Sequence, residues 1–180
     1  DEFVWGKVSR ISPEAPVPVV WVQSESVMPG GAANVANNLN ALGAQVSVIG
    51  AVGEDRWGEL LLRELTARAI DVGGVVYAKR PTTVKTRVIA HHQQVVRVDR
   101  EQPDSHHEQT AQRLIEAAVE RLRDADAVII EDYGKGVITR RLLEVVIPAA
   151  RRRRKLVTVD PKQEHFDLYR RVTALTPNRA

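Results

Sequence analysis

The 180-residue chain has no cysteine, few aromatic residues and no long apolar run. The absence of cysteine excludes disulfide bonds and thiolate metal sites. Aromatic residues make up only 4% of the chain, so aliphatic side chains must fill the core. No apolar run approaches the ~20 residues that a membrane-spanning helix needs, and no signal peptide opens the sequence. We therefore expect a cytoplasmic protein without a membrane partner.

The charge of the chain is close to balanced, with a formal net charge of +3. Part of the basic excess lies in the run RRRRK at residues 151–155. Such a run can indicate nucleic-acid binding, but this one follows an apolar helical pattern, where cations interact favourably with the helix dipole. Because aromatic interleaving and a recognisable nucleic-acid module are both missing, we interpret the run as a helix end and expect no nucleic-acid partner.

Helical and strand patterns alternate through most of the chain. Apolar residues recur at helical spacing in residues 32–42, 57–70, 107–123 and 140–150, and a short helix is expected over 165–171. Gly43 follows the first helix as a C′ glycine, and Thr139 caps the fourth. Short β-branched strands are expected over residues 45–50, 126–132, 155–160 and 172–178. This alternation predicts an α/β fold in which a parallel sheet is covered on both faces.

Two parts of the chain interrupt the alternation. Residues 3–27 are strand-like but contain Pro13, Pro16 and Pro18, and prolines confine strands to sheet edges. The segments TTVKTRVIA and QVVRVD alternate polar and apolar residues and are joined through His91-His92, which predicts a hairpin. We expect both parts, over approximately residues 3–27 and 75–100, to form a small separate sheet. The α/β core then covers approximately residues 30–74 and 105–180.

Polar residues follow each predicted parallel strand, in the segments GAVGEDRWG, EDYGKG, DPK and TPN. Ligands of open parallel sheets bind beyond the carboxyl ends of the strands. Each segment alone is explained by turn-forming and helix-capping residues. Together, however, they supply carboxylates, lysines and glycine amides that can face an anion. This edge predicts a site for a phosphorylated, hydroxyl-rich ligand.

Several other classes of site have no motif in this sequence. There is no P-loop, no G-x-G-x-x-G after a strand and no G-x-S-x-G. The histidines occur mainly as adjacent pairs, which do not share a helix face and chelate metals poorly. No metal-ligating residues are predicted.

The segment PGGAANVANNL places two glycines at a helix start. The first backbone N–H groups of a helix have no intrahelical partner, and a side chain at Gly30 or Gly31 would separate them from a ligand. Asn34 and Asn38 are four residues apart and share one helix face, which fits a polyol. They fit equally well as solvent-facing residues of mediocre helix propensity.

These segments carry a family resemblance. GGAANVANNLNALGAQVSVIGAVGED, together with DYGKG, DPK and LTPN, resembles the ribokinase-like (PfkB) family of sugar kinases. WGKVSRISPEAPVPVV, TTVKTRVIAHHQQVVRVDRE and EDYGKGVIT are similar to the members that phosphorylate D-glycero-D-manno-heptose 7-phosphate in lipopolysaccharide-core synthesis. Some of these are fused to an adenylyltransferase. The resemblance covers essentially the whole chain and implies a ribokinase-like sandwich with a small β lid, ATP and Mg²⁺ as cofactors, and a homodimer through the lid.

The resemblance implies sugar-binding roles for residues of this chain. Asp1 matches the family aspartate that holds sugar hydroxyls. Gly30, Gly31 and Asn34 match the glycine pair and the asparagine that hold the sugar. Asp132 is expected to face the same cleft and to contact the substrate.

Phosphate-binding roles fall on a second set of residues. Lys85, Arg87 and Arg10 are candidates for the 7-phosphate, because a dianion favours two or three cations. A solvated strand face explains them equally well. Lys162 and Asn178 are expected near the ATP phosphates, and Asn178 matches the asparagine of the family motif N-x-x-E.

The chain also departs from the family pattern. The glutamate of N-x-x-E would follow Ala180, and the G-A-G-D motif with the catalytic aspartate does not occur. A first strand before Asp1 is missing as well. We therefore expect a fold that is incomplete at both ends, with no catalytic residue in this chain and no turnover by it alone. Two alternatives stay open: another sugar kinase of the family, of the ribose or fructose type, and a non-catalytic sugar-phosphate-binding or dimerisation module.

Overall fold

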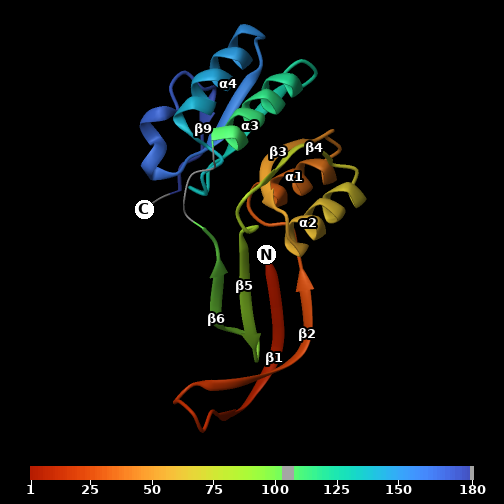
Figure 1. The fold of residues 1–180 in the computed structure, drawn as a ribbon, viewed down its shortest axis with the longest axis vertical. Coiled ribbons are helices and arrows are strands. Elements are labelled where there is room, and N and C mark those ends of the chain that lie inside the picture. Colours follow the sequence, from red (N-terminus) through yellow and green to blue (C-terminus); the bar gives the residue numbers. More distant parts are fainter. Residues whose placement is uncertain (103–107, 179–180) are drawn as a thin grey trace.

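The structure is a computed structural model that describes residues 1–102 and 108–178. A long sheet projects from an α/β part, which lies at the other end of the molecule (Figure 1). The elements along the chain are β1 (Glu2–Ile11), β2 (Pro18–Val27), α1 (Ala32–Ala41), β3 (Ser47–Gly53), α2 (Arg56–Ala67), β4 (Asp71–Ala78), β5 (Val84–Ala90), β6 (Gln93–Arg100), α3 (Glu108–Arg121), β7 (Ala127–Glu131), α4 (Arg140–Arg152), β8 (Leu156–Asp160), the 3₁₀-helix η1 (Gln163–Leu168) and β9 (Ala174–Leu175). His107, the first residue of the third predicted helix, lies outside the described residues.

The projecting sheet has the strand order β2–β1–β5–β6. Two antiparallel hairpins, β1–β2 and β5–β6, meet through parallel pairing of β1 with β5. The edge strand β2 begins at Pro18, in the position that proline tolerates. His91 and His92 both have positive φ, 49° and 65°, and form the two-residue turn between β5 and β6. The two segments that interrupt the sequence alternation thus form one sheet.

The strand β4 is missing from the sequence prediction, which places residues 75–78 in the projecting sheet. Instead, β4 pairs in parallel with β3. The adjacent Gly73 and Gly74 interrupt its apolar pattern and hide it in the sequence. A Cβ on Gly74 would lie 2.2 Å from Ile49 Cδ1, so the close packing of β4 against β3 requires glycine at this position.

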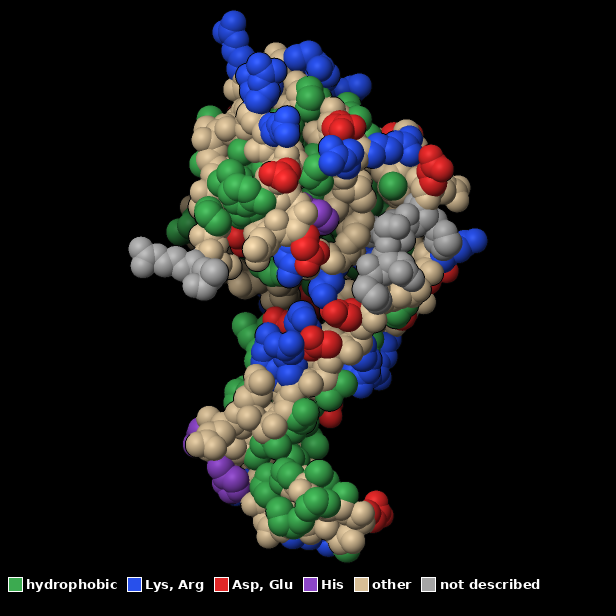
Figure 2. Space-filling model, turned by 90° about the vertical axis from the view of Figure 1, so that its left-hand side faces the viewer, with side chains coloured by type: hydrophobic (Ala, Val, Ile, Leu, Met, Phe, Trp, Pro, Cys, Tyr) green, Lys and Arg blue, Asp and Glu red, His purple; other side chains and the backbone are tan. Residues whose placement is uncertain are grey.

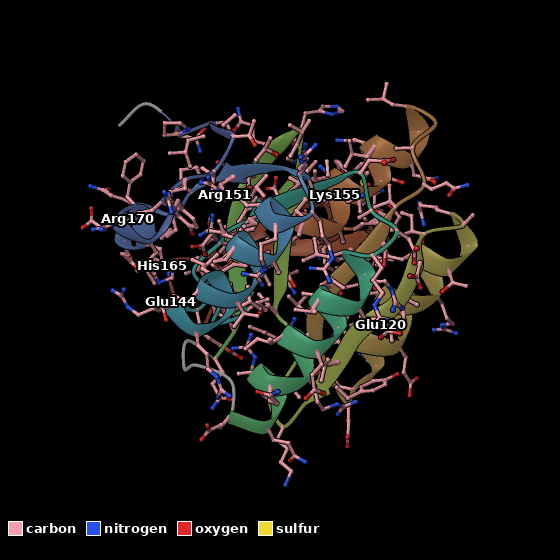
Figure 3. The ribbon with its side chains drawn as sticks, turned by 90° about the horizontal axis from the view of Figure 1, so that it is seen from above. Glu120, Glu144, Arg151, Lys155, His165 and Arg170 are labelled. Carbon is pink, nitrogen blue, oxygen red and sulfur yellow. The ribbon has the colours of Figure 1, made fainter. Side chains whose placement is uncertain are left out.

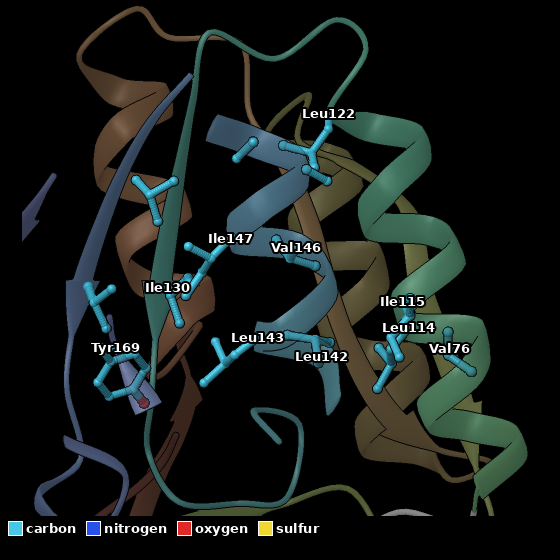
Figure 4. Close-up of a cluster of buried hydrophobic side chains, with 14 residues drawn as sticks. Val76, Leu114, Ile115, Leu122, Ile130, Leu142, Leu143, Val146, Ile147 and Tyr169 are labelled. Atoms are coloured by element: carbon cyan, nitrogen blue, oxygen red, sulfur yellow. The ribbon is translucent and has the colours of Figure 1, made fainter. Parts of the chain in front are cut away.

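Helices cover the parallel strands of the α/β part, as the alternation predicts. The helices α1 and α2 pack on β3–β4 through a small cluster that includes Ala33, Ala36 and Leu65. The helices α3 and α4 enclose the larger core (Figure 4). Leu114 and Val157 in this core are each 1% exposed, and burying such a side chain stabilises the fold by roughly 1.5–3 kcal/mol. No helix among the described residues is both long and apolar enough to cross a bilayer.

Local signals fix the helix ends that the sequence predicts. Gly43 has φ +90°, and the N–H groups of Gly43 and Ala44 donate to the carbonyls of Asn40 and Leu39, which is the Schellman arrangement. Thr139 Oγ1 accepts the Leu142 N–H at 3.2 Å at the start of α4.

The basic run lies at the end of α4. Arg151 and Arg152 occupy the last helical turn, where their charges meet the negative end of the helix dipole. Arg151 and Lys155 are labelled in the view from above (Figure 3). The interpretation of the run as a helix end is confirmed.

The parallel strands form two sheets, whereas the sequence predicts one. Hydrogen bonds join β3 to β4 and link β7, β8 and β9 in that order, but no described strand connects β3 with β7. Both β3 and β7 border a cavity of about 1880 Å³, which α1, α2 and α4 also line. Each of these strands therefore leaves one row of backbone groups without a strand partner among residues 1–102 and 108–178.

Asp55 joins the start of α2 to the base of the projecting sheet. Its Oδ1 accepts the N–H groups of Trp57 at 3.0 Å and Gly58 at 2.9 Å, and its Oδ2 accepts the Thr82 N–H at 2.7 Å. Burial alone would raise the pKa of Asp55, but the hydrogen bonds outweigh it and hold the pKa below its usual value.

We expect Asp55→Ala to lower the free energy of unfolding by about 1–2 kcal/mol at pH 7, because a helix cap and a loop anchor are lost together. The contribution of a carboxyl whose pKa is lowered by folding is present above its unfolded pKa and declines as the pH falls. The loss should therefore shrink in acid. Urea unfolding from pH 7 downward measures it, with the exposed neighbour substitution Glu54→Ala as the control. Equal losses for both variants would contradict this role.

Candidate functional site

The diglycine at the start of α1 packs against groups from two other parts of the chain. Gly31 is the N-cap and has φ +52°, a conformation that favours glycine. A Cβ on Gly30 would lie 2.8 Å from Asp1 Oδ2, and a Cβ on Gly31 would lie 3.3 Å from Tyr133 Cε2. The two glycines make room for a carboxylate and an aromatic ring, and all four residues border the cavity.

A buried carboxylate fixes the loop that carries Tyr133. The Asp132 side chain is 1% exposed. Its Oδ1 accepts the Gly134 N–H at 2.8 Å, while its Oδ2 lies 2.5 Å from His165 Nδ1 and accepts the Tyr169 hydroxyl. Burial raises the pKa of Tyr169 above its usual value, and the hydrogen bond to Asp132 raises it further.

The sequence predicts that Asp132 contacts the substrate. Asp132 borders the cavity, but its carboxylate is already hydrogen-bonded within the protein. Both of its oxygens are occupied by protein groups, because His165 and Tyr169 from the segment after β8 fold over it. His165 lies on η1, seen from above in Figure 3. We therefore assign Asp132 to holding the loop in place.

The loop after β7 also packs against the loop after β8. Gly134 has φ +65°, and a Cβ built on it would lie 3.4 Å from Lys162 Cε. Lys162 itself is exposed. Gly31 thus lies beside Tyr133, and Gly134 of the same loop lies beside Lys162. The start of α1 and the loops after β7 and β8 are therefore close together, as the sequence predicts for the carboxyl ends of parallel strands.

Two carboxylates face each other at the ends of neighbouring strands. Glu131 on β7 is the register partner of Asp160 on β8. Burial raises the pKa of Glu131, and the negative charge of Asp160 raises it further. The pKa of Tyr133 is raised by burial and then by the same two carboxylates. Among residues 1–102 and 108–178 there is no group of three or more potential metal ligands, so this pair would need groups from elsewhere to hold a cation.

Lys85 and Arg87 extend from β5 into the cavity, on one face of the projecting sheet. Lys85 Nζ lies 3.0 Å from Asp99 Oδ2, and Arg87 Nη1 lies 3.1 Å from Asp1 Oδ1. Basic and acidic side chains gather where the projecting sheet meets the α/β part (Figure 2). Two of the three candidate phosphate ligands therefore line the same cavity, and Arg87 contacts the predicted sugar aspartate directly.

The third candidate, Arg10, is not brought to the site. It pairs with Val19 near the far end of β1 and does not line the cavity. Strands rise about 3.3 Å per residue, so the nine residues from Asp1 place Arg10 tens of ångströms away. The sequence does not reveal this separation, because the proline-rich pattern gives no hint that β1 is one continuous ten-residue strand.

The two predicted asparagines lie in exposed positions. Asn34 is in the first turn of α1, on the side away from the cavity lining. Asn178 follows β9 and leaves the sheet at the same edge as Asp160, because the Thr176 N–H donates to the Val159 carbonyl.

Sequence reasoning missed the residues that connect the two parts of the molecule. Arg80 Nη2 donates to the Lys135 carbonyl at 2.5 Å, and Lys135 Nζ lies 2.6 Å from Glu101. It also missed Tyr133 and Arg97, which line the cavity. The available signal was the alternation in QVVRVD, which places Arg97 and Asp99 on one strand face.

With this geometry established, comparison with known proteins identifies the family. The model of the pfkB family carbohydrate kinases matches residues 3–180. The chain belongs to this family. The membership of the PfkB carbohydrate kinases expected from the sequence is therefore confirmed.

Two relatives carry the name bifunctional protein HldE. The one from Helicobacter pylori (strain P12) is 46% identical over 181 residues, which cover 100% of this chain and 39% of the relative. The one from Desulfatibacillum aliphaticivorans is 45% identical and covers 99% of this chain and 37% of the relative. The chain thus spans about two fifths of the length of these relatives.

Solved structures share the fold. The tetrameric inhibited form of phosphofructokinase-2 from Escherichia coli matches with a TM-score of 0.69 at 22% identity, covering 98% of this chain and 57% of the other. A putative phosphofructokinase from Staphylococcus aureus matches with a TM-score of 0.74 at 13% identity, covering 99% and 56%. The predicted ribokinase-like α/β class is confirmed.

The contact of Gly31 with Tyr133 predicts a specific mutational effect. Gly31→Ala should lower the melting temperature and move the Tyr133 ring, which near-ultraviolet circular dichroism detects. Gly43→Ala is the matched control, because Gly43 also has positive φ but nothing lies within 4 Å of an added Cβ. Both variants place a side chain on a backbone with positive φ, which costs about 1–3 kcal/mol, and only Gly31→Ala should change the aromatic signal. An unchanged signal would show that Tyr133 does not rest on the glycine.

The facing carboxylates predict a pH-dependent gain in stability. Since folding raises the pKa of Glu131, its ionised form destabilises the native state, and this penalty disappears below the unfolded pKa of about 4.3. Glu131→Gln should raise the melting temperature at pH 8 by about 1–3 °C and leave it nearly unchanged at pH 4. Glu120→Gln, at a side chain that is 68% exposed, should show no such trend. A gain that is independent of pH would contradict the prediction.

Proposed function

We propose that the intact protein carrying this chain transfers the γ-phosphoryl group of ATP to O1 of D-glycero-β-D-manno-heptose 7-phosphate. The product would be the 1,7-bisphosphate, on the way to ADP-heptose for the lipopolysaccharide core. The observation that carries the proposal is the ion pair between Asp1 and Arg87 beside Gly30. It puts an acceptor for sugar hydroxyls next to a cation for a sugar phosphate, as a phosphorylated polyol requires.

The sugar would be held by Asp1, by the two glycines at the start of α1 and by two basic side chains of β5. The Asp1 carboxylate accepts hydrogen bonds from sugar hydroxyls, and Gly30 and Gly31 allow the ligand to approach the start of α1. Asn34 lies in the same helical turn but on the exposed side away from the cavity lining, so we assign the hydroxyl contacts to Asp1 and the helix start. Lys85 and Arg87 bind the 7-phosphate.

The nucleotide would approach along the other strand exits. Lys162 and Asn178 follow β8 and β9 and are proposed to face the ATP phosphates. Mg²⁺ bound to those phosphates would neutralise their charge, and the chain's own contribution would be positioning and electrostatic stabilisation. The catalytic base is expected outside this chain.

The projecting sheet supports a homodimer as the working form. Its edge strand β2 exposes large apolar side chains, among them Trp21, which is 62% exposed, and Val22, which is 55% exposed. Hydrophobic side chains also gather on the lower part of the projecting sheet in Figure 2. Contiguous exposed apolar patches mark interaction surfaces, and β2 and β6 leave free strand edges. A cytoplasmic location accords with the ATP and sugar-phosphate substrates.

Side-by-side kinase assays of the intact protein test the proposed substrate. With ATP and Mg²⁺, turnover should be fastest with heptose 7-phosphate and at least tenfold slower with ribose or fructose. Faster turnover of ribose or fructose would favour another sugar kinase of the family. Absence of turnover with all three, together with measurable binding of the sugar phosphate, would favour the non-catalytic module.

Residues 1–180 alone should show no ATP-dependent turnover, because the expected catalytic base is absent from them. Coupled detection of ADP release at enzyme concentrations up to tens of micromolar measures this. The intact protein serves as the positive control. Turnover by the isolated segment would refute the assignment of the base to another part of the protein.

A further inference from the structure

The projecting sheet carries a second arginine at the phosphate end of the site, and it bears on substrate selection. Arg97 on β6 is the direct register partner of Arg87 on β5 in the antiparallel hairpin. Both side chains lie on the face that lines the cavity. Like charges placed directly opposite each other destabilise a strand pair, so this arrangement is costly unless an anion lies between them.

The carboxylates around this pair neutralise it only in part. Glu101 lies 3.9 Å from Lys85 Nζ but is shared with Lys135, whose Nζ is 2.6 Å away. Asp99 accepts from Lys85 at 3.0 Å through Oδ2 and from Arg97 Nε at 2.9 Å through Oδ1, so one carboxylate serves two cations. The hydrogen bond from Lys85 contributes most to a pKa of Asp99 below its usual value, which keeps the carboxylate ionised.

Arg87 retains an unused donor. Its Nη1 is paired with Asp1 by charge but not by hydrogen-bond geometry, and this atom is buried without a hydrogen-bond partner among the described residues. A buried donor without an acceptor is costly. The Arg87 side chain as a whole is 27% exposed and lines the cavity, so its other guanidinium N–H groups can meet an acceptor there. This face of the sheet therefore carries three cations, Lys85, Arg87 and Arg97. Their N–H groups can donate further hydrogen bonds to an anion with several oxygen atoms, such as a phosphate.

We infer that Arg97 completes the subsite for the phosphate that the sugar already carries, with Arg87 and Arg97 on two sides of it and Lys85 at the third. Asp99 is the positioning residue that aims Lys85 and Arg97 at the same point. The subsite makes the protein select phosphorylated over unphosphorylated sugars. This inference rests on the proposed function, which supplies the sugar.

The kinetic test uses Arg97→Ala in the intact protein, with Arg100→Ala as the matched control. Arg100 lies on the same strand but on the opposite face, where it contacts Glu2 and Thr86. Arg97→Ala should raise KM for the sugar phosphate about 10- to 100-fold, the factor expected for one charged hydrogen-bonded contact. The KM for the same sugar without its phosphate should stay within about twofold, because that substrate lacks the group.

Arg97→Lys should restore part of the loss, since charge returns without the planar fork. Asp99→Asn should raise KM for the sugar phosphate by a smaller factor and leave kcat unchanged. Equal effects of Arg97→Ala on both sugars, or effects no larger than those of Arg100→Ala, would overturn the inference. If no sugar is turned over at all, the proposed function fails independently.

A binding measurement tests the phosphate subsite separately from the proposed kinase activity. Inorganic phosphate, added at constant ionic strength, should raise the melting temperature of the parent protein and of Arg100→Ala, but not that of Arg97→Ala. This result supports the subsite even for a protein without kinase activity. An equal shift in all three proteins would show that phosphate binds elsewhere, and the subsite would be rejected.

Discussion

The arrangement of the site depends on one buried charge. Asp132 follows β7 and is removed from water, a cost that only hydrogen bonds to its carboxylate can offset. Three donors do so, and they come from the loop at Gly134 and from the segment that carries His165 and Tyr169. The carboxylate thereby fastens the exits of two parallel strands to each other and sets the position of Tyr133 against the start of α1.

The connection between the two parts of the molecule is of a different kind. Arg80, Glu101 and Lys135 link the projecting sheet to the loop after β7 through half-exposed polar contacts. Exposed ion pairs contribute little to stability and exchange partners readily. A rigid edge built around a buried carboxylate is thus joined to a sheet whose attachment can rearrange at small cost, which suits a site that must admit and enclose a ligand.

Much of the fold followed from local sequence signals. The β-branched strands, the glycine at position 43 and the histidine turn act within a few residues, so their effects are legible in the sequence. The strand β4 was missed because Gly73 and Gly74 interrupt its apolar pattern, and packing against β3 requires the glycine at position 74. The length of β1 sets the distance to Arg10, and the proline-rich sequence gives no hint that β1 is one continuous strand.

The candidate site was predictable in outline, because parallel strands deliver their exits to one edge whatever their order. Its internal contacts were not. The partners of Asp132 are 33 and 37 residues away in the chain, and no local pattern connects them. Arg97 was hidden for the same reason, since its significance lies in the residue opposite it on another strand.

The divided parallel sheet has a consequence for assembly. One edge of β3 and one edge of β7 carry backbone N–H and C=O groups that have no strand partner among the described residues. Apolar side chains line the cavity beside these edges. A β-strand that pairs with either edge would satisfy these backbone groups and bury the apolar side chains beside them.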